Sequence, residues 1–285
     1  MEKEILKFIG NTPFIRLYGF EKHNSIKSHV FAKLEYMNPF GSIKDRAAYR
    51  IIVDAEKNGI LKSNREIIEA SSGNMGIALA AISQIKGYKC TIIMPENMTE
   101  KRKELIKKYG AKLILTKADD GMKGSIDMIE KLKSEHSFWI NQFNNSSNTL
   151  AHYMSTAREI DLALKGSADT IICGIGSGGT ISGLRKYFVN SEIIGVLPAS
   201  NEDVIPGIGA GFAPFLVDMN TYKSAVKISL QESLDARDGL LKTDGIFVGY
   251  SSGAVLAACQ KLCKAREDQN KNIVLIFADS GERYI

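Results

Sequence analysis

The chain has 285 residues, with 37 Lys and Arg against 32 Asp and Glu, so its net charge is +5 at neutral pH. Hydrophobic residues make up 44% and charged residues 24%, which is typical of a folded globular protein and excludes a disordered or collagen-like chain. No apolar run approaches the roughly 18–20 residues of a membrane span, and the start of the chain lacks the apolar core of a signal peptide. We therefore expect a cytoplasmic protein of one large or two medium domains.

Metal and nucleic-acid functions are also disfavoured. The four cysteines form no CxxC pair, and Cys259 and Cys263 stand four residues apart among small residues that indicate helix packing. The basic run 101–103 is interleaved with Glu100 and Glu104, a pattern typical of a solvated helix face. We expect no metal, no nucleic acid and no membrane as partners, whereas a small anionic ligand is compatible with the charge.

The hydrophobic pattern predicts an α/β protein, because short apolar runs alternate with polar or Gly-rich turns and helical patterns. In chain order, the expected strands are 65–69, 89–94, 112–115, 170–173, 192–196, 224–228 and 273–277. The expected helices are 44–58, 75–86, 99–109, 121–135, 151–165, 180–188, 229–243 and 253–266. A polar stretch at 142–149 is predicted to be a loop that divides two similar α/β halves.

Four Gly- and Ser-rich turns are the candidate ligand-binding segments, at 38–46, 71–76, 174–180 and 249–253. The last three follow an apolar run and precede a helical pattern. In an open α/β sheet this position lies at the carboxyl ends of the strands, where ligands bind. We expect several of these turns to face one crevice and to form one site.

The turn at 174–180 is the clearest anion cradle, because clustered glycines let backbone N–H groups converge next to a helix N-terminus. A tight turn without a ligand is the simpler alternative. A dinucleotide site would need an acidic residue at the end of the next strand, which instead ends at 196–198 as Val-Leu-Pro, and a Walker loop would need a lysine before Thr180. The pattern favours a phosphate monoester.

Lys44 stands at the start of an expected helix, where the helix dipole disfavours a cation. One explanation is an amine that is kept neutral or covalently engaged, as in Schiff-base lysines. The alternative is an exposed lysine beside Asp45 and Arg46. Together, the phosphate cradle and the lysine indicate pyridoxal 5′-phosphate as the cofactor.

The motifs at 9–13, 38–46, 69–74, 94–98, 142–145, 176–180 and 279–284 match those of a known family in order. The chain resembles the fold-type II pyridoxal-phosphate enzymes of the cysteine synthase (O-acetylserine sulfhydrylase) family and is most similar to the B isoform. The resemblance implies two α/β lobes, each with a mostly parallel twisted sheet flanked by helices. Residues 36–145 would form a smaller, mobile domain that binds the substrate carboxylate, and residues 1–35 plus 146–285 a larger domain that binds the cofactor phosphate.

The resemblance also implies a role for each site residue. Lys44 would hold the cofactor covalently and later act as the general base. The other cofactor-binding residues would be Asn74 at the ring 3′-oxygen, Ser251 at the ring nitrogen, and Gly176, Ser177, Gly178, Gly179 and Thr180 around the phosphate. The substrate would contact Ser71, Ser72, Gly73, Met75, Gln142 and Gly207.

The implied reaction is β-replacement, in which the β-substituent of O-acetylserine or a similar serine or cysteine derivative is eliminated to aminoacrylate and a sulfur nucleophile is added. One alternative is a cysteine lyase that releases hydrogen sulfide, or a synthase of another β-substituted alanine such as diaminopropionate. A regulatory binding subunit without activity is the alternative from another class. A homodimer is expected from the family, and the C-terminal peptide of a serine acetyltransferase is a candidate partner.

Three departures from the family pattern bear on specificity. Met75 stands where relatives usually have threonine, and Phe40 stands where they usually have a small residue and is expected to narrow the entrance. The segment 197–206 is short as in the B isoform but continues at 207–212 as in the A isoform, without the B isoform's basic and aromatic residues. Thiosulfate use is therefore not implied, and sulfide, water or a second thiol stay open as nucleophiles.

Two further polar residues have both structural and functional interpretations. His152 is the one histidine close to the Gln142 segment in sequence, and we favour a structural role for it. Asp279 follows the last apolar run, where it could line the cofactor pocket or cap a helix or loop.

Overall fold

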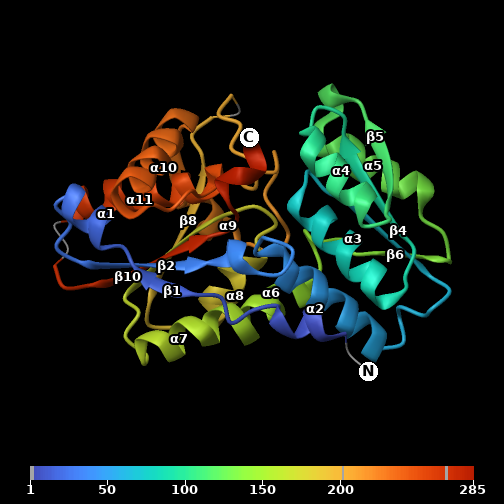
Figure 1. The fold of residues 1–285 in the computed structure, drawn as a ribbon, viewed down its shortest axis with the longest axis horizontal. Coiled ribbons are helices and arrows are strands. Elements are labelled where there is room, and N and C mark those ends of the chain that lie inside the picture. Colours follow the sequence, from blue (N-terminus) through green and yellow to red (C-terminus); the bar gives the residue numbers. More distant parts are fainter. Residues whose placement is uncertain (1–2, 201, 267–268) are drawn as a thin grey trace.

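The computed structural model describes residues 3–200, 202–266 and 269–285, which form two α/β lobes side by side (Figure 1). Both the first two residues of the chain and one residue of the 197–206 segment lie outside the described residues. Helices α2 (Lys44–Lys57) and α6 (Ser146–Ala151) pack against each other between the lobes. The two lobes with sheets flanked by helices confirm the expected fold class.

The larger lobe contains a six-stranded sheet in the order β1-β2-β10-β7-β8-β9. Only the pairing of β1 with β2 is antiparallel within this sheet. The strands are β1 (Phe14–Arg16), β2 (His29–Leu34), β7 (Thr170–Gly174), β8 (Glu192–Pro198), β9 (Val226–Ile228) and β10 (Asn272–Phe277). The helices of this lobe are α1 (Tyr18–His23), α7 (Arg158–Leu164), α8 (Gly179–Tyr187), α9 (Met219–Lys223), α10 (Leu230–Asp244) and α11 (Tyr250–Arg266).

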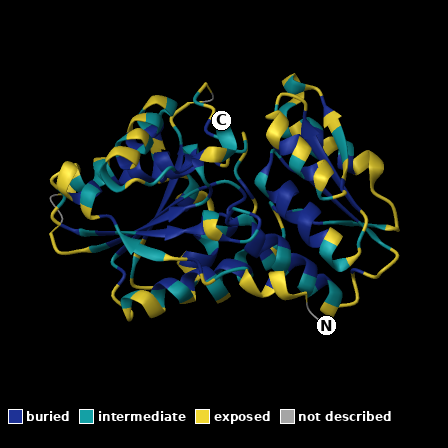
Figure 2. Cartoon of the chain, viewed as in Figure 1, coloured by how far each residue is buried: buried dark blue, intermediate teal, exposed yellow. Residues whose placement is uncertain are grey.

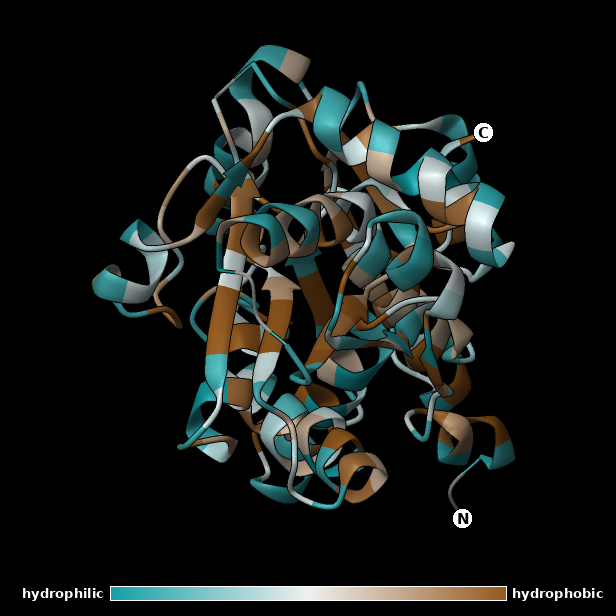
Figure 3. Cartoon of the chain, turned by 90° about the vertical axis from the view of Figure 1, so that its left-hand side faces the viewer, coloured by the Kyte–Doolittle hydropathy of each residue, from teal (hydrophilic) through white to brown (hydrophobic). Residues whose placement is uncertain are grey.

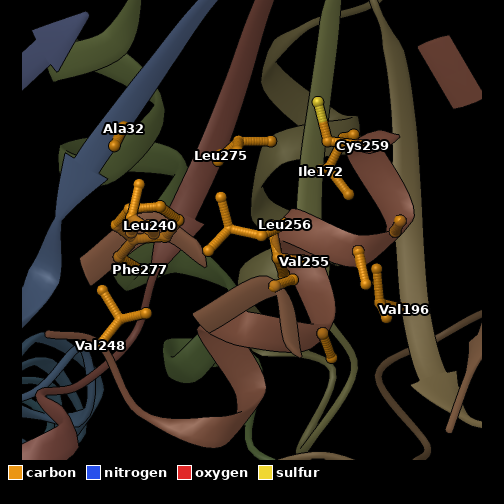
Figure 4. Packing of buried hydrophobic residues seen from close by; sticks show 14 of the residues in the cluster. Ala32, Ile172, Val196, Leu240, Val248, Val255, Leu256, Cys259, Leu275 and Phe277 are labelled. Atoms are coloured by element: carbon orange, nitrogen blue, oxygen red, sulfur yellow. The ribbon is translucent and has the colours of Figure 1, made fainter. Parts of the chain in front are cut away.

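Both faces of this sheet are covered, which explains why its central strands are almost continuously hydrophobic. On one face, Leu256 of α11 packs with Leu275 and Phe277 of β10 and with Leu240 of α10 (Figure 4). On the other face, Leu184 of α8 belongs to a second buried cluster. In Figure 3 the hydrophobic strands lie at the centre of the lobe, whereas the surrounding helices carry hydrophilic segments.

The smaller lobe contains a four-stranded, fully parallel sheet in the order β5-β4-β3-β6. Its strands are β3 (Glu66–Ala70), β4 (Cys90–Pro95), β5 (Lys112–Thr116) and β6 (Ser137–Trp139). Its helices are α3 (Asn74–Lys86), α4 (Glu100–Lys108) and α5 (Gly121–Leu132). The residues of α3 from Met75 to Ser83 are all buried, and α3 is correspondingly dark in Figure 2. This helix therefore anchors the lobe's core at the side that faces the larger lobe (Figure 1).

The seven expected strands all form, with their ends shifted by a few residues, but β1, β2 and β6 were not expected. β1 and β6 have three residues each, and β2 contains a buried lysine that interrupts its hydrophobic pattern. The prediction of a polar loop over 142–149 is wrong in its second half, because α6 begins at Ser146. Asn145 caps this helix, because its side chain accepts a hydrogen bond from the N–H of Ser147 at 3.0 Å. The expected helix 151–165 is correspondingly divided into the end of α6, a π-helical segment (His152–Ala157) and α7.

A buried cluster of four charged side chains connects α2 to β2, to the residue after β2 and to α7. Arg46 of α2 donates Nε to Glu35 at 2.6 Å and Nη1 to Glu159 of α7 at 2.6 Å. Lys33 of β2 reaches the other oxygen of Glu159 at 2.6 Å and also the Thr12 hydroxyl at 2.6 Å. Since Arg46 follows Lys44 by two residues on α2, this cluster fixes the helix on which Lys44 is carried.

The described part of the chain contains no helix that combines the length and the apolar character of a membrane span.

Candidate active site

The glycine-rich turns meet in one crevice between the lobes. A cavity of about 660 Å³ is lined by the turn after β3, the turn after β7, the segment 204–211 and the start of α11. This volume lies in the usual range for a small-molecule site. Of the expected site residues, those lining this cavity or the smaller pocket beneath it are Lys44, Ser71, Ser72, Asn74, Met75, Gln142, Gly176, Ser177, Gly178, Thr180, Gly207 and Ser251.

Gly73 and Gly179 are in neither set of lining residues, and each lies against a neighbouring side chain. A Cβ atom on Gly73 would approach the Arg102 side chain to 2.8 Å, and one on Gly179 would approach the Asn148 amide to 2.0 Å. These two glycines allow close packing behind the turns, and they contribute to the site through the backbone only.

Lys44 is the first residue of α2, and its Nζ atom lies 3.5 Å from the hydroxyl of Ser177. Burial lowers the pKa of Lys44 to about 8, although the carboxyl of Asp279 acts in the opposite direction. A large fraction of this amine is therefore neutral near pH 8, which is the state in which a lysine attacks a carbonyl carbon. The sequence interpretation of an amine kept neutral is consistent with this environment.

The turn at 176–180 lines the smaller pocket together with Lys44. A Cβ atom on Gly176 would lie 2.4 Å from the carbonyl oxygen of Gly207, and Gly178 has a φ of +87°, so both positions need glycine. α8 begins at Gly179, and the N–H groups of a helix's first turn have no partners within the helix. Such a turn suits a phosphate group, because N–H groups and the helix dipole both favour an anion.

His152 supports this turn from behind. Its ring is buried, with Nδ1 at 3.0 Å from the hydroxyl of Thr156 and Nε2 at 3.3 Å from that of Thr180. Burial, followed by the nearby charge of Lys44, lowers the pKa of His152 to about 3, so the ring is neutral. The geometry agrees with the favoured structural role, and it adds that His152 contacts a residue of the cradle.

The turn after β3 brings backbone donors to the opposite side of the cavity. The hydroxyl of Ser71 accepts hydrogen bonds from the N–H groups of Gly73 at 3.1 Å and Gly76 at 2.9 Å, so Ser71 shapes the turn itself. Ser72, Asn74 and the buried thioether of Met75 line the cavity at the start of α3. At position 75, where relatives usually have the hydroxyl of threonine, the cavity is lined by an apolar side chain.

Asn74 is held by the C-terminal segment of the chain. Its Nδ2 atom donates to Asp279 at 2.6 Å, and its Oδ1 atom accepts from Nη1 of Arg283 at 2.6 Å. Tyr284 also donates to Asp279, at 2.6 Å. Asp279 thus orients Asn74 without lining the cavity itself, and the second hydrogen of the Asn74 amide stays available to a ligand.

Arg102 and Tyr284 line the cavity but were missed by sequence reasoning. The Arg102 guanidinium lies 4.8 Å from the centre of the Tyr284 ring, and Nη1 is 3.3 Å from the carbonyl oxygen of Ser72. The prediction that 101–103 lie on a solvated helix face is wrong for two of the three residues, because Arg102 and Lys103 are only 5% and 8% exposed. Their long apolar stems pack inward while their charged ends reach backbone carbonyls.

Phe40 does not narrow the entrance as expected. Its ring packs edge-on against Tyr109, with 6.1 Å between ring centres, in the core of the smaller lobe. Its backbone N–H donates to Asp45 at 2.6 Å and its carbonyl accepts from Arg283. Phe40 therefore stabilises the turn before Lys44 and does not line the cavity.

The residues fit a cofactor with a phosphate and an aldehyde. A buried, partly neutral lysine stands next to a backbone cradle for an anion, and the hydroxyl of Ser251 lies in the same pocket. Within the described residues, no group of three or more His, Cys, Asp or Glu is arranged to hold a metal ion. The donor set is that of an organic phosphate.

We expect Gly176→Ala to weaken cofactor retention at least tenfold, because the added Cβ must displace the Gly207 backbone at 2.4 Å. Equilibrium dialysis with visible absorption measures this retention. Gly239→Ala in α10 is the matched control, since nothing lies within 4 Å of the added atom and alanine favours a helix. Equal retention by the two variants would show that the turn is not the phosphate site.

Comparison with known proteins agrees with this geometry. The family described as "Pyridoxal-phosphate dependent enzyme" matches residues 5–279. A cysteine synthase of Buchnera aphidicola subsp. Schizaphis graminum is 39% identical, over 97% of this chain and 92% of its own length. The O-acetyl serine sulfhydrylase isoform 3 of Entamoeba histolytica has a TM-score of 0.93 at 36% identity, covering 100% of this chain and 90% of that one.

A hydrogen sulfide-producing enzyme of Fusobacterium nucleatum has a TM-score of 0.94 at 34% identity, and the match covers 100% of both chains. The family match and these relatives extend over nearly the whole sequence. The chain therefore belongs to the pyridoxal-phosphate-dependent enzymes and is a cysteine synthase-like member of that family.

Proposed function

We propose that this enzyme performs β-replacement on O-acetylserine or a similar serine or cysteine derivative, with a sulfur nucleophile as the second substrate. The observation that carries the proposal is the single cavity in which Lys44 faces the turn after β3 and Gln142. This arrangement provides one amine for covalent and proton-transfer chemistry opposite a set of donors for a carboxylate. Cysteine synthases of 36–39% identity support the choice of reaction.

We propose for the cofactor the contacts that the family resemblance implies. The turn from Gly176 to Thr180 would hold the phosphate, Asn74 the ring oxygen and Ser251 the ring nitrogen. When bound, the cofactor supplies the electron sink that makes the α-proton of an amino acid acidic. A neutral hydroxyl at Ser251 does not favour a protonated ring as a carboxylate would, which suits elimination of a good leaving group better than transamination.

The protein's own groups would then divide the remaining work. Ser72, the first N–H groups of α3 and Gln142 would bind the substrate carboxylate and orient the α-proton toward Nζ of Lys44. Lys44 would take that proton and later return it, a role that its lowered pKa favours. Arg102 would hold the turn in place through the carbonyl of Ser72.

A second candidate reaction is the release of hydrogen sulfide from cysteine. Two observations favour it: the thioether of Met75 replaces a hydroxyl at the carboxylate site, and the hydrogen sulfide-producing enzyme of Fusobacterium nucleatum matches this chain over its full length. Both reactions would use the same groups and would differ in leaving group and nucleophile.

One experiment separates these functions. The holoenzyme is incubated with cysteine alone and, separately, with O-acetylserine plus sulfide, and the amino-acid products are identified by mass spectrometry. We expect cysteine to form from O-acetylserine and sulfide. Sulfide release from cysteine as the faster reaction would instead favour the lyase, and no turnover of any β-substituted alanine would favour a regulatory binding subunit.

We further propose that residues 36–145 form the smaller, mobile domain and that 1–35 plus 146–285 form the larger one. The four-stranded sheet lies wholly within 36–145, which supports this division. We also propose a homodimer, which the family resemblance implies, and a cytoplasmic location, which the sequence suggests. The N–H groups at the start of α3 that would bind the substrate carboxylate would also suit the C-terminal carboxylate of a peptide from a serine acetyltransferase.

A further inference from the structure

A buried carboxyl group lies directly behind the proposed carboxylate site. Glu69 is near the end of β3, its residue is 1% exposed, and it is not among the residues that line the cavity. Its Oε1 atom accepts from Nε2 of Gln142 at 3.1 Å, and its Oε2 atom accepts from the N–H of Asn141 at 2.8 Å. Its side chain therefore reaches the site through Gln142 and the turn that carries it.

The amide of Gln142 is oriented by these contacts. Its Nε2 atom lies between Glu69 and the carbonyl oxygen of Ala70, which is 3.3 Å away. An amide nitrogen has two hydrogens, so both are directed toward the sheet and the Oε1 atom is left for the cavity that Gln142 lines. A carbonyl oxygen accepts hydrogen bonds and repels a carboxylate, so this orientation does not suit a substrate carboxylate.

We propose that Glu69 is a positioning residue that decides which end of the Gln142 amide faces the substrate. A protonated Glu69 donates its O–H to Oε1 of Gln142, and the rotated amide presents Nε2 to the substrate carboxylate. This rotation breaks the 3.3 Å hydrogen bond from Nε2 to the carbonyl oxygen of Ala70, and the new bonds to Glu69 and to the substrate replace it. An ionised Glu69 accepts from Nε2 and leaves Oε1 in the cavity. This inference rests on the proposed function, in which Gln142 binds that carboxylate.

The amide orientation in the structure is the one assigned above to an ionised Glu69, whereas burial favours the protonated form. Burial raises the pKa of Glu69 to about 8, while the hydrogen bonds from Gln142 and Asn141, together with the Trp139 indole, act in the opposite direction. On the flanking strands it faces the indole of Trp139 on β6 and the Cys90 thiol on β4, whose own pKa is raised to about 12 by burial. Glu35 is buried to the same degree but faces the guanidinium of Arg46. Unlike Glu35, Glu69 has neutral hydrogen-bond partners.

The test measures how pH changes the affinity of the holoenzyme for L-serine, followed by visible absorption. We expect affinity to fall at least about tenfold as pH rises through 8, because one hydrogen bond to a charged group is lost. Deprotonation of the ligand's amine acts in the opposite direction. Glu69→Gln should remove this fall, since glutamine keeps the shape but does not titrate in this range.

Glu66→Gln is the matched control, because Glu66 lies on the same strand and bonds the hydroxyl of Thr91 away from the cavity. It should keep the wild-type pH profile. Gln142→Met is a second variant, which removes the amide that rotates while Glu69 still titrates, so the fall in affinity should again disappear. This variant keeps the inference testable if Glu69→Gln does not fold.

A second readout does not depend on ligand binding. In the ¹³C NMR spectrum of protein labelled at Glu carboxyl carbons, we expect one carboxyl that titrates near pH 8 and is missing in Glu69→Gln. A Glu69 already ionised at pH 6, or an unchanged affinity profile in Glu69→Gln, would overturn the inference. If neither the wild type nor any variant binds L-serine, the proposed function is overturned instead. The NMR result would still report whether Glu69 is protonated.

Discussion

Lys44→Ala should abolish covalent attachment of the cofactor and lower turnover by at least about 10², the smallest contribution usual for a general base. Two roles are lost at once, because the same buried amine is proposed to hold the cofactor and to move the α-proton. Among the described residues, the Ser177 hydroxyl lies 3.5 Å from Nζ, and the buried ring of His152 is a weak base because burial lowers its pKa to about 3. The measurement is borohydride reduction of the holoenzyme followed by peptide mass mapping.

The expected product is a reduced cofactor adduct on the peptide containing Lys44, and none in the variant. Lys123→Ala is the control, because that lysine is exposed on α5 and forms a salt bridge at 2.6 Å with Asp127 of the same helix. It should keep both the adduct and the turnover. An adduct that persists at another lysine in Lys44→Ala would show that Lys44 is not the attachment site.

The parts of the site that could be predicted from the sequence are those built from neighbouring residues. The turn at 176–180 combines glycines with the start of α8 within one short segment, and Lys44 directly follows its own Gly-Ser turn. Such local patterns are readable because a backbone turn and a helix start depend on adjacent residues. In the structure, Lys44, the cradle and Ser251 line one pocket.

The parts that could not be predicted depend on contacts between distant segments. Arg102 lies over Tyr284, which is 182 positions later in the chain, and Asp279 meets Asn74 across the crevice. A charge run alone does not reveal which of its members turns inward. Ser71 lines the cavity, but its hydroxyl is occupied by the N–H groups of its own turn, which its position in the sequence does not reveal.

The same limit explains why β2 was missed. Lys33 interrupts its apolar pattern and is typical of a surface position, yet the residue is 1% exposed. Its charge is neutralised by a salt bridge to Glu159 of α7, a residue distant from Lys33 in the sequence. Lys33 can therefore be buried only because the other charges of the cluster compensate its own. Removing a member of this cluster is expected to have the largest effect on stability.

Arg46→Ala should lower the free energy of unfolding by about 3–5 kcal/mol, as expected when one partner of a buried ion pair is removed. Burial opposes the ionisation of Glu35 and Glu159, but Arg46 holds the pKa of both carboxyls below the ordinary value of 4.5, to about 2 for Glu159. Without the guanidinium, Glu35 would be left 0% exposed and without its ion-pair partner. Urea unfolding of the holoenzyme, followed by circular dichroism, measures the loss.

Because the two carboxyls have lowered pKa values, their contribution is complete above their unfolded pKa and is lost as pH falls from about 4.5 toward 2. The wild type should therefore lose stability over that range, and Arg46→Ala should lose less. Lys123→Ala, which breaks an exposed pair, should leave both the urea midpoint and its pH dependence unchanged. If Arg46→Ala unfolds at the wild-type urea concentration, the cluster does not stabilise α2, and the placement of Lys44 must depend on the turn before it.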